Sequence, residues 1–323
     1  MPWTEVQIFR EWFYRAVDSW FSADIACCDS CYDEFIAIWP YAYDANDAEF
    51  QSNGIPLDCL YSGSRLPEIY SRDDFNRLVK EIECPRCGAD LIGNIWAYEL
   101  PFDIPDNFEN TVREIADIAS RTPFLLLEHP FCQDILRAIK ELIGSSSATQ
   151  INTSLYRGRS SEKNDVTEEI ASFDFPPKRV VEEGRYNHAG NSSLYLASDA
   201  DTCVAELRNT NSTICEFFFE HKLHILDLVS PFDNHEKSAD LLNALVYSAL
   251  VSAKQPEEGF HKPHFVVSRF VADCAKLAGF HAIKYPSTRM TKTNFNLVLL
   301  NPELTLEKYA KVVSYHHHAR KID

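Results

Sequence analysis

The residues best suited to chemistry lie between positions 185 and 208. A basic residue, a glycine turn, a short apolar run and one acid follow one another there, in RYNHAGNSSLYLASDADTCVAELR. The run 194–197 predicts a strand, and Asp199 predicts the start of a short helix over 201–208. Glu206 stands on that helix beside apolar residues, so its carboxylate could point into a cleft. A solvated surface charge is the alternative interpretation.

Two C-x2-C pairs form the second candidate site. Their four members are Cys28, Cys31, Cys84 and Cys87. Two such pairs can close a tetrahedral site around Zn²⁺, and four thiolates leave no open position, so the predicted role is structural. The 52 residues between the pairs imply an insertion. Buried free thiols are the alternative, and Cys27 or Cys59 could replace one ligand.

Composition indicates a globular protein inside the cell. The chain has 323 residues, of which 45% are hydrophobic and 24% charged, and it is long enough for two domains. No apolar run approaches the roughly 20 residues of a membrane helix, and the N-terminus lacks the layout of a signal peptide. A cytoplasmic location is therefore expected, where ten cysteines favour metal binding over disulfides.

The net charge of −17 is concentrated in the first half. Residues 1–150 hold 11 Lys and Arg against 26 Asp and Glu, a charge of −15, whereas residues 151–323 hold 20 against 22, a charge of −2. Direct nucleic-acid binding is not expected, because phosphate contacts use clustered Lys and Arg. The acidity suits a basic protein partner, or it simply keeps the protein soluble.

The segment GSSSATQ at 144–150 is the best linker in the chain. It predicts a mainly helical N-terminal domain at 1–146 with the zinc site, and a second domain at 150–323. In the first domain we expect helices at 3–21, 71–82, 107–120 and 131–143, and a strand at 91–100. In the second we expect strands at 154–157, 194–197, 214–219, 223–229, 282–285 and 295–300, and helices at 201–208, 238–253, 263–279 and 305–313. Short strands mixed with helices predict an α+β fold.

Four segments of the second half follow an order found in one family. They are LYRGR at 155–159, the stretch 185–208, AIKYPSTR at 282–289 and NLVLLNP at 296–302. An Arg at a strand end, an Arg with a Glu, and a Ser after a strand resemble the RES domain, over roughly residues 150 to 315. The resemblance implies a fold like that of the ADP-ribosyltransferases.

The first half resembles the zinc-containing helical domain found ahead of some RES domains and related to HEPN proteins. HEPN ribonucleases carry an Arg and a His at a closer spacing than the seven residues between Arg121 and His129. Nuclease activity is therefore not predicted.

The RES resemblance implies NAD+ as substrate, with cleavage of the bond between nicotinamide and ribose. It implies catalytic roles for Arg157, Glu206 and Ser287, and substrate binding by Tyr156, Arg185, Tyr195 and Asn296. These residue types suit the substrate. Arginine forks bind phosphate oxygens, a tyrosine can pack on nicotinamide or bind its carboxamide, and serine and asparagine can orient ribose or phosphate. A carboxylate can bind ribose hydroxyls or stabilise an oxocarbenium-like transition state.

Other polar residues beside these motifs are weaker candidates. Arg159, Lys284 and Arg289 could hold phosphate, or they are solvated charges. His188 lies in the glycine turn and is expected at the surface, with a substrate contact as the alternative. The three histidines at 316–318 resemble a metal-binding tract but are expected to be solvated.

The resemblance implies an NAD+-consuming toxin of a bacterial toxin–antitoxin or defence system. Inorganic phosphate as acceptor would make it a phosphorylase, water a glycohydrolase, and a protein side chain an ADP-ribosyltransferase. A separate antitoxin or inhibitor protein is expected, unless the acidic N-terminal domain controls access; a homo-oligomer is left open. The rival is a catalytically inactive module that recruits a partner through its zinc domain. No G-x-G-x-x-G or Walker motif is present, which excludes Rossmann-type hydride transfer and P-loop hydrolysis.

Overall fold

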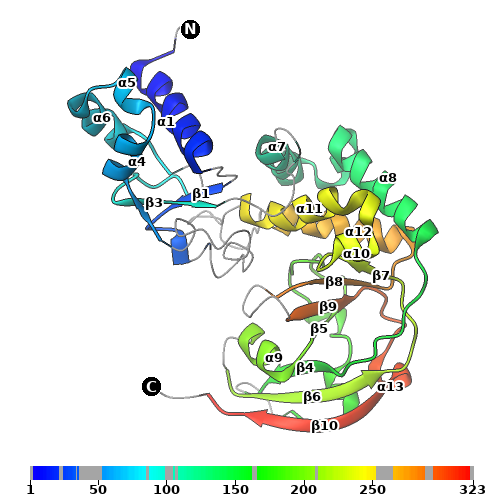
Figure 1. Cartoon of the computed structure of the whole chain (residues 1–323). Coiled ribbons are helices and arrows are strands. Elements are labelled where there is room, and N and C mark those ends of the chain that lie inside the picture. Colours follow the sequence, from blue (N-terminus) through cyan, green and yellow to red (C-terminus); the bar gives the residue numbers. More distant parts are fainter. Residues whose placement is uncertain are drawn as a thin grey trace. The chain divides into compact units, whose positions relative to one another are not determined.

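The structure, a computed structural model, describes residues 3–21, 25–33, 35, 53–84, 87–98, 105, 108–161, 166–207, 210–251, 265–287 and 294–320. The chain divides into two compact units, Met1–Asp103 and Ile104–Asp323. Helices and strands occur in both (Figure 1), which confirms the predicted α+β class. Among the described residues, no helix combines the length and the apolar character needed to cross a membrane.

The first unit combines helices with a small antiparallel sheet. Its elements are α1 (Glu5–Phe21), β1 (Ile25–Cys28), β2 (Ile55–Pro56), α4 (Leu57–Gly63), α5 (Leu66–Ile69), α6 (Arg72–Leu78), the 3-10 helix η2 (Val79–Glu81) and β3 (Asn94–Tyr98). The strand order is β1-β3-β2. Phe9 and Phe13 of α1 are fully buried, and their rings lie 5.9 and 6.5 Å from that of Phe75 in α6. The apolar spacing of 3–21 therefore reflects a core-facing helix, as predicted.

The second unit is built on a seven-stranded sheet (Figure 1). Its strands are β4 (Leu155–Ser160), β5 (Leu194–Ala197), β6 (Ser212–Phe219), β7 (Ile225–Asp227), β8 (Ala282–Pro286), β9 (Phe295–Leu299) and β10 (Ala310–His318). The order is β10-β6-β4-β5-β9-β8-β7, and β7 and β8 run parallel whereas the other pairs are antiparallel. Leu155, Leu196, Phe217 and Leu297 form part of the core on this sheet.

Helices precede this sheet and connect its strands. They are α7 (Phe108–Arg121), η3 (Pro123–Glu128), α8 (Pro130–Ser145), η4 (Ile170–Phe173), η5 (Lys178–Val180), α9 (Ala200–Glu206), α10 (Pro231–Asn234), η6 (Glu236–Ser238), α11 (Ala239–Val251), α12 (Val266–Ala278) and α13 (Leu306–Tyr309). Of these, α12 packs on β8, and α7, α8 and α11 pack on α12.

The boundary between the two compact units lies between Asp103 and Ile104, on the N-terminal side of the predicted domain boundary at 144–150. Helix α8 buries Ile135 and Ile139 and packs against α12, so α7 and α8 belong to the second unit rather than to the unit with the cysteines. Thr149, in the expected linker, pairs with Leu223 as an isolated bridge. The linker therefore crosses from α8 to β4 within one unit.

The predicted helix over 305–313 is wrong beyond its first turn. Helix α13 ends at Tyr309, and β10 follows as an edge strand that pairs with β6. Val312 lies opposite Phe217 and His316 opposite Ile214. The β-branched and aromatic residues of this segment favour a strand, and pairing with a distant partner decides the outcome. The histidine tract at 316–318 therefore belongs to a strand.

Candidate active site and metal centre

The sheet opens between β4 and β5, and Arg157 occupies the opening. Within the described residues, these strands share one register pair, Tyr156 with Ala197. Beyond this pair, Arg157 Nη1 donates to the backbone oxygen of Tyr195 at 2.8 Å. The side chain therefore replaces a missing backbone partner, which fixes the guanidinium at the point where the strands separate.

Arg157 is half-buried, and its guanidinium is a cation without an acidic partner among the described residues. Its Nε is buried and has no hydrogen-bond partner within the described part of the chain, and no ion pair joins Arg157 to a carboxylate there. Burial, with a smaller effect from the charge of Arg159, lowers the pKa of Arg157 to about 10. The group is still charged at neutral pH. Because an uncompensated buried charge is costly, this environment favours an anionic ligand.

Glu206, Ser287 and Asn296 come together from three elements. Glu206 is the last residue of α9, and its Oε1 accepts from Asn296 Nδ2 at 2.8 Å and from Ser287 Oγ at 3.4 Å. Asn296 and Ser287 are buried, whereas Glu206 is exposed. Two donors in the core thus hold a carboxylate that faces solvent.

A cleft of about 280 Å³ contains both Arg157 and Glu206. Asn296 and the tyrosines Tyr156, Tyr195 and Tyr285 also line it. The cleft therefore combines a half-buried cation, an oriented carboxylate and aromatic rings. That combination is suited to a ligand with a negative group, a ring and hydroxyls.

Helix α9 is held against the sheet by its own N-cap. Asp199 Oδ1 accepts from Thr202 N at 2.8 Å, and its Oδ2 accepts from Thr202 Oγ1 at 2.7 Å and from Asn294 Nδ2 at 2.6 Å. Burial pushes the pKa of Asp199 upward, but hydrogen bonds from Thr202, Ser198 and Asn294 hold it below its usual value. These contacts place Glu206 relative to β9. The sequence signals the cap but not its link to Asn294.

Close approach of β4 to α9 depends on Gly158. A Cβ at this position would lie 2.4 Å from Leu207 Cδ1 and 2.9 Å from Cys203 Sγ. Both contacts are shorter than normal van der Waals separations, so a larger residue would have to displace the side chains of Leu207 and Cys203.

The tyrosine hydroxyls of the cleft are engaged with protein atoms. Tyr156 donates to Glu216 Oε1 at 3.1 Å, and Tyr195 donates to Asn187 Oδ1 at 2.8 Å. Their rings, rather than their hydroxyls, are thus the parts offered to the cleft. Tyr285 has no role in the sequence predictions, although it stands two residues before Ser287. Burial, followed by the charge of Glu206, raises its pKa well above the usual value.

The other predicted cations are not gathered in the cleft. Arg185 stacks beside it, with its guanidinium 5.5 Å from the Phe265 ring centroid and 5.7 Å from that of Tyr285. Arg159 donates to the carbonyl oxygens of Ser172 and Asp174 at 3.1 and 3.0 Å.

Lys284 and His188 have acidic partners elsewhere. Lys284 Nζ lies 3.0 Å from Asp227 Oδ2, and His188 Nε2 lies 2.8 Å from Asp273 Oδ2. The candidate phosphate ligand Arg289 lies outside the described residues.

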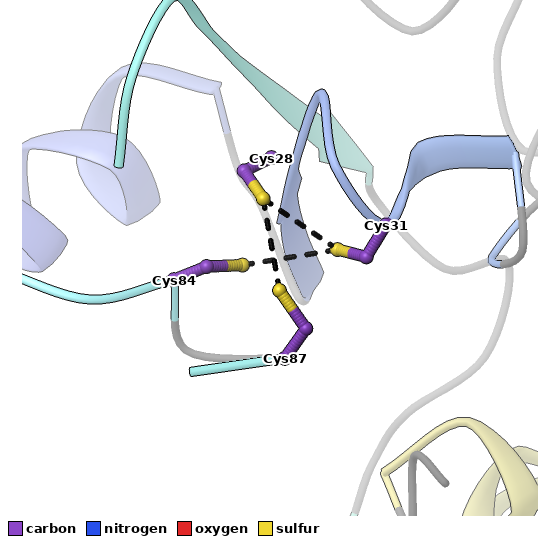
Figure 2. Close-up of side chains that lie close together, drawn as sticks. All are labelled: Cys28, Cys31, Cys84 and Cys87. Atoms are coloured by element: carbon purple, nitrogen blue, oxygen red, sulfur yellow. Dashed lines mark hydrogen bonds between the residues drawn. The ribbon is translucent and has the colours of Figure 1, made fainter. Parts of the chain in front are cut away.

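The four predicted cysteine ligands converge in the first unit (Figure 2). The Sγ atoms of Cys28 and Cys31 are 3.9 Å apart, those of Cys28 and Cys87 3.7 Å, and those of Cys31 and Cys84 3.9 Å. All four lie within 4.8 Å of one another. A tetrahedron with Zn–S bonds of about 2.3 Å has S–S edges of about 3.8 Å. The cluster therefore has the dimensions of a metal site with four thiolate ligands.

The first cysteine pair is fastened to β3 by Asp29. Asp29 Oδ2 accepts from Asn94 N at 2.9 Å, and Oδ1 accepts from Trp96 Nε1 at 2.8 Å. Tyr32 stacks on Trp96 with 3.6 Å between ring centroids. Gly93 has φ +86°, and a Cβ there would lie 2.5 Å from Asp29 Oδ2. These contacts fix the position of the first cysteine pair on the sheet.

The alternative ligands do not join the cluster. Cys27 is buried beside it and Cys59 is exposed, and neither belongs to the group of four. Burial raises the pKa of Cys87 to about 11, so this thiol needs a cation at the centre to ionise at neutral pH.

Comparison with known proteins agrees with the predicted family. The family model described as "RES domain" matches residues 156–318, half of the chain, and the chain belongs to the RES domain family. Among solved structures, the M. tuberculosis MbcT–MbcA toxin–antitoxin complex contains a similar chain, with 14% identity and a TM-score of 0.35 over 57% of this chain and 93% of that one. No curated protein matches.

Proposed function

We propose that this protein consumes NAD+ by cleaving the bond between nicotinamide and ribose. Membership of the RES domain family supports the substrate class. The observation that carries the proposal is that one cleft holds an oriented Glu206 and a half-buried Arg157, which has no acidic partner in the described parts of the chain. NAD+ supplies what this cleft lacks, namely phosphate charge for the arginine and a riboside for the carboxylate.

The cleft volume limits how much of NAD+ the cleft can hold. Pockets for drug-sized ligands span about 300 to 1,000 Å³, and the cleft has about 280 Å³, so it does not enclose the whole molecule. We assign the nicotinamide riboside portion to the cleft because Glu206 lies there, and the adenosine portion then lies outside. The pyrophosphate then sits at the boundary, between Arg157 within the cleft and Arg185 beside it.

The residues suit cleavage of the N-glycosidic bond. The bond between ribose C1′ and the nicotinamide nitrogen breaks, and its electron pair leaves with nicotinamide as a neutral molecule. No general acid is needed for this departure. Positive charge develops on the ribose, and Glu206, held by Asn296 and Ser287, stabilises it. An acceptor oxygen, from inorganic phosphate or from water, then bonds to C1′.

We propose that the cysteine cluster holds one structural zinc ion. Four thiolates complete a tetrahedral shell and leave no position for substrate. In the cell, we propose that the enzyme acts in the cytoplasm as a toxin that a separate antitoxin or inhibitor protein restrains.

Product analysis with the purified full chain tests the proposal. NAD+ loss that requires inorganic phosphate and yields phosphorylated ADP-ribose identifies a phosphorylase, and loss without phosphate identifies a glycohydrolase. Label transferred from NAD+ to a protein identifies an ADP-ribosyltransferase instead. No NAD+ loss under any of these conditions would refute the proposed activity.

A matched pair of variants ties the activity to the cleft. Glu206→Gln keeps an acceptor for Asn296 but removes the charge, and we expect turnover to fall about 10²- to 10³-fold. Glu220→Gln makes the same change at an exposed acid outside the cleft, and its turnover should match the wild type. Wild-type turnover in Glu206→Gln would exclude the Glu206 carboxylate from the chemical step, whereas a wild type without turnover would favour an inactive binding module.

A further inference from the structure

The turn that carries Arg185 has a fixed backbone. Gly184 N donates to Asn187 O at 3.0 Å, and the two residues form an isolated β-bridge. Arg185 and Tyr186 therefore stand at the tip of a tight turn. The Arg185 guanidinium lies over the ring of Tyr285, which also lines the cleft. The placement of this turn thus decides where the charge of Arg185 stands relative to the cleft.

Asn187 holds the turn from inside. Its side chain is 4% exposed. Nδ2 donates to the carbonyl oxygens of Glu182 and His188 at 2.9 and 3.0 Å, and Oδ1 accepts from the Tyr195 hydroxyl at 2.8 Å. One buried amide therefore joins both flanks of the turn to strand β5.

Tyr195 connects both arginines. Its hydroxyl accepts from Tyr186 N at 3.0 Å and donates to Asn187, and burial raises its pKa to about 12, so the proton remains available. Its backbone oxygen accepts from Arg157 Nη1 at 2.8 Å. One end of this residue places Arg157, and the other end places the turn with Arg185.

Two further contacts leave the turn little freedom. A Cβ at Gly184 would lie 2.3 Å from Asn187 Oδ1 and 2.8 Å from the Tyr195 hydroxyl, so glycine is needed for this contact. On the other side, Ser268 Oγ of α12 donates to Arg185 O at 2.7 Å. The amide, the hydroxyl and the helix together define one position for Arg185.

We propose that Asn187 is a positioning residue that sets, through Tyr195, the placement of Arg185 relative to Arg157, and thereby the fit of a diphosphate between them. The inference rests on the proposed function, because it assigns that placement to the pyrophosphate of NAD+. Without the amide, the turn shifts and Arg185 no longer meets the phosphates. The contacts of Glu206 with Asn296 and Ser287 do not involve Asn187, so the chemical step is preserved.

The test measures binding and turnover separately in the full chain. Asn187→Ser should weaken ADP-ribose binding and raise KM for NAD+ roughly tenfold, with a much smaller change in kcat. In an Arg185→Ala background, the same substitution should cause no further loss of ADP-ribose affinity. Asn191→Ser alters the same residue type at an exposed position of the same loop and should behave as the wild type.

Each outcome distinguishes the inference from the proposed function. Equal loss of ADP-ribose affinity with and without Arg185 would mean that Asn187 acts independently of it and would overturn the inference. Wild-type affinity in Asn187→Ser would also overturn it, while NAD+ consumption by the wild type would leave the proposed function standing. A wild type that neither binds ADP-ribose nor consumes NAD+ overturns both. If Asn187→Ser does not fold, Tyr195→Phe removes the same hydroxyl contact and enters the same comparison.

Discussion

The cysteine cluster and the cleft both join residues that are far apart in the chain. The cluster brings together four like side chains, whereas the cleft brings together side chains of opposite charge. Cys31 and Cys84 are 53 positions apart, and Glu206 and Asn296 are 90 apart. The cluster consists of four identical side chains that a single cation would satisfy together. The cleft contains an arginine that forms no ion pair within the described residues, and a carboxylate that is open to solvent. Four side chains that can fill the coordination shell of one cation are suited to stabilising a fold. Charged groups without partners of opposite charge are suited to binding a substrate.

The largest expected effect concerns the cluster. Cys84→Ser should release about one zinc ion per chain, because three thiolates cannot close the tetrahedron. Structural zinc contributes an apparent 10–16 kcal/mol in zinc-finger peptides, so the first unit should lose its fold. The cleft residues lie in the second unit, and NAD+ turnover should persist. Metal analysis and amide exchange of each unit measure these changes.

A control and a contrary result complete this test. Cys59→Ser replaces an exposed thiol outside the cluster and should retain the metal. If the Cys84→Ser protein is metal-free and still folded, zinc has no structural role in the first unit. Loss of turnover together with loss of the metal would show that the two units are coupled.

The second prediction concerns the buried cation. Arg157→Lys keeps a positive charge, but an ammonium group cannot form a planar fork or reach both Tyr195 O and a phosphate. We expect turnover to fall about 100-fold, the cost of misplacing a positioning group. Steady-state kinetics measure it, with Arg179→Lys as a control at an exposed arginine. Near-normal turnover in Arg157→Lys would exclude Arg157 from the site.

The third prediction concerns the cap that places Glu206. Asp199→Ala removes the acceptor for Thr202 and Asn294, and loss of an N-cap costs about 1–2 kcal/mol of unfolding free energy. Denaturant unfolding measures the change. Asp201→Ala alters an exposed acid in the first turn of the same helix and should have little effect. Equal destabilisation by both substitutions would contradict a specific role for the cap.

The convergence of the four cysteines could be predicted because a tetrahedral site imposes a local spacing on each pair. The candidate residues of the cleft were predicted from the order of their segments, since no local pattern joins residues from four strands and a helix, and their roles remain a proposal. The partners of the tyrosine hydroxyls, Glu216 for Tyr156 and Asn187 for Tyr195, depend on tertiary packing. The ion pair of Lys284 with Asp227 spans 57 positions and left no trace in the sequence.

The prediction of a helix over 305–313 was wrong because tertiary pairing, which the sequence pattern does not show, decides the structure of this segment. The segment carries an apolar pattern that a helix or a strand can use, and pairing with β6 selects the strand. Periodicity describes which face of an element is apolar, but it does not supply the partner. The sequence therefore indicates most elements of the second unit, but it does not indicate that β10 forms an edge strand of the sheet.

The smallest expected effect again separates the two units, through pH. All eleven histidines lie in the second unit. Burial lowers the pKa of His235 and, together with His224 and His221, that of His281. Each ring uses an unprotonated nitrogen, because His235 Nε2 accepts from Asp227 N and His281 Nδ1 accepts from His224 N, both at 3.1 Å. Protonation of either ring would break a backbone contact.

The sign of the pH effect follows from these lowered pKa values. Below about pH 6.5 the unfolded chain binds more protons at these histidines than the folded chain does, so the second unit loses stability as the pH falls. The protection factors of its amides, which are corrected for the fall in intrinsic exchange rate with pH, should therefore decrease between about pH 7.5 and 5.5. In the double variant His235→Gln and His281→Asn, each new side chain still accepts from the backbone N–H but cannot titrate, so this decrease should be smaller. An unchanged pH dependence in the double variant would assign acid sensitivity to other groups and would weaken the contrast between the units.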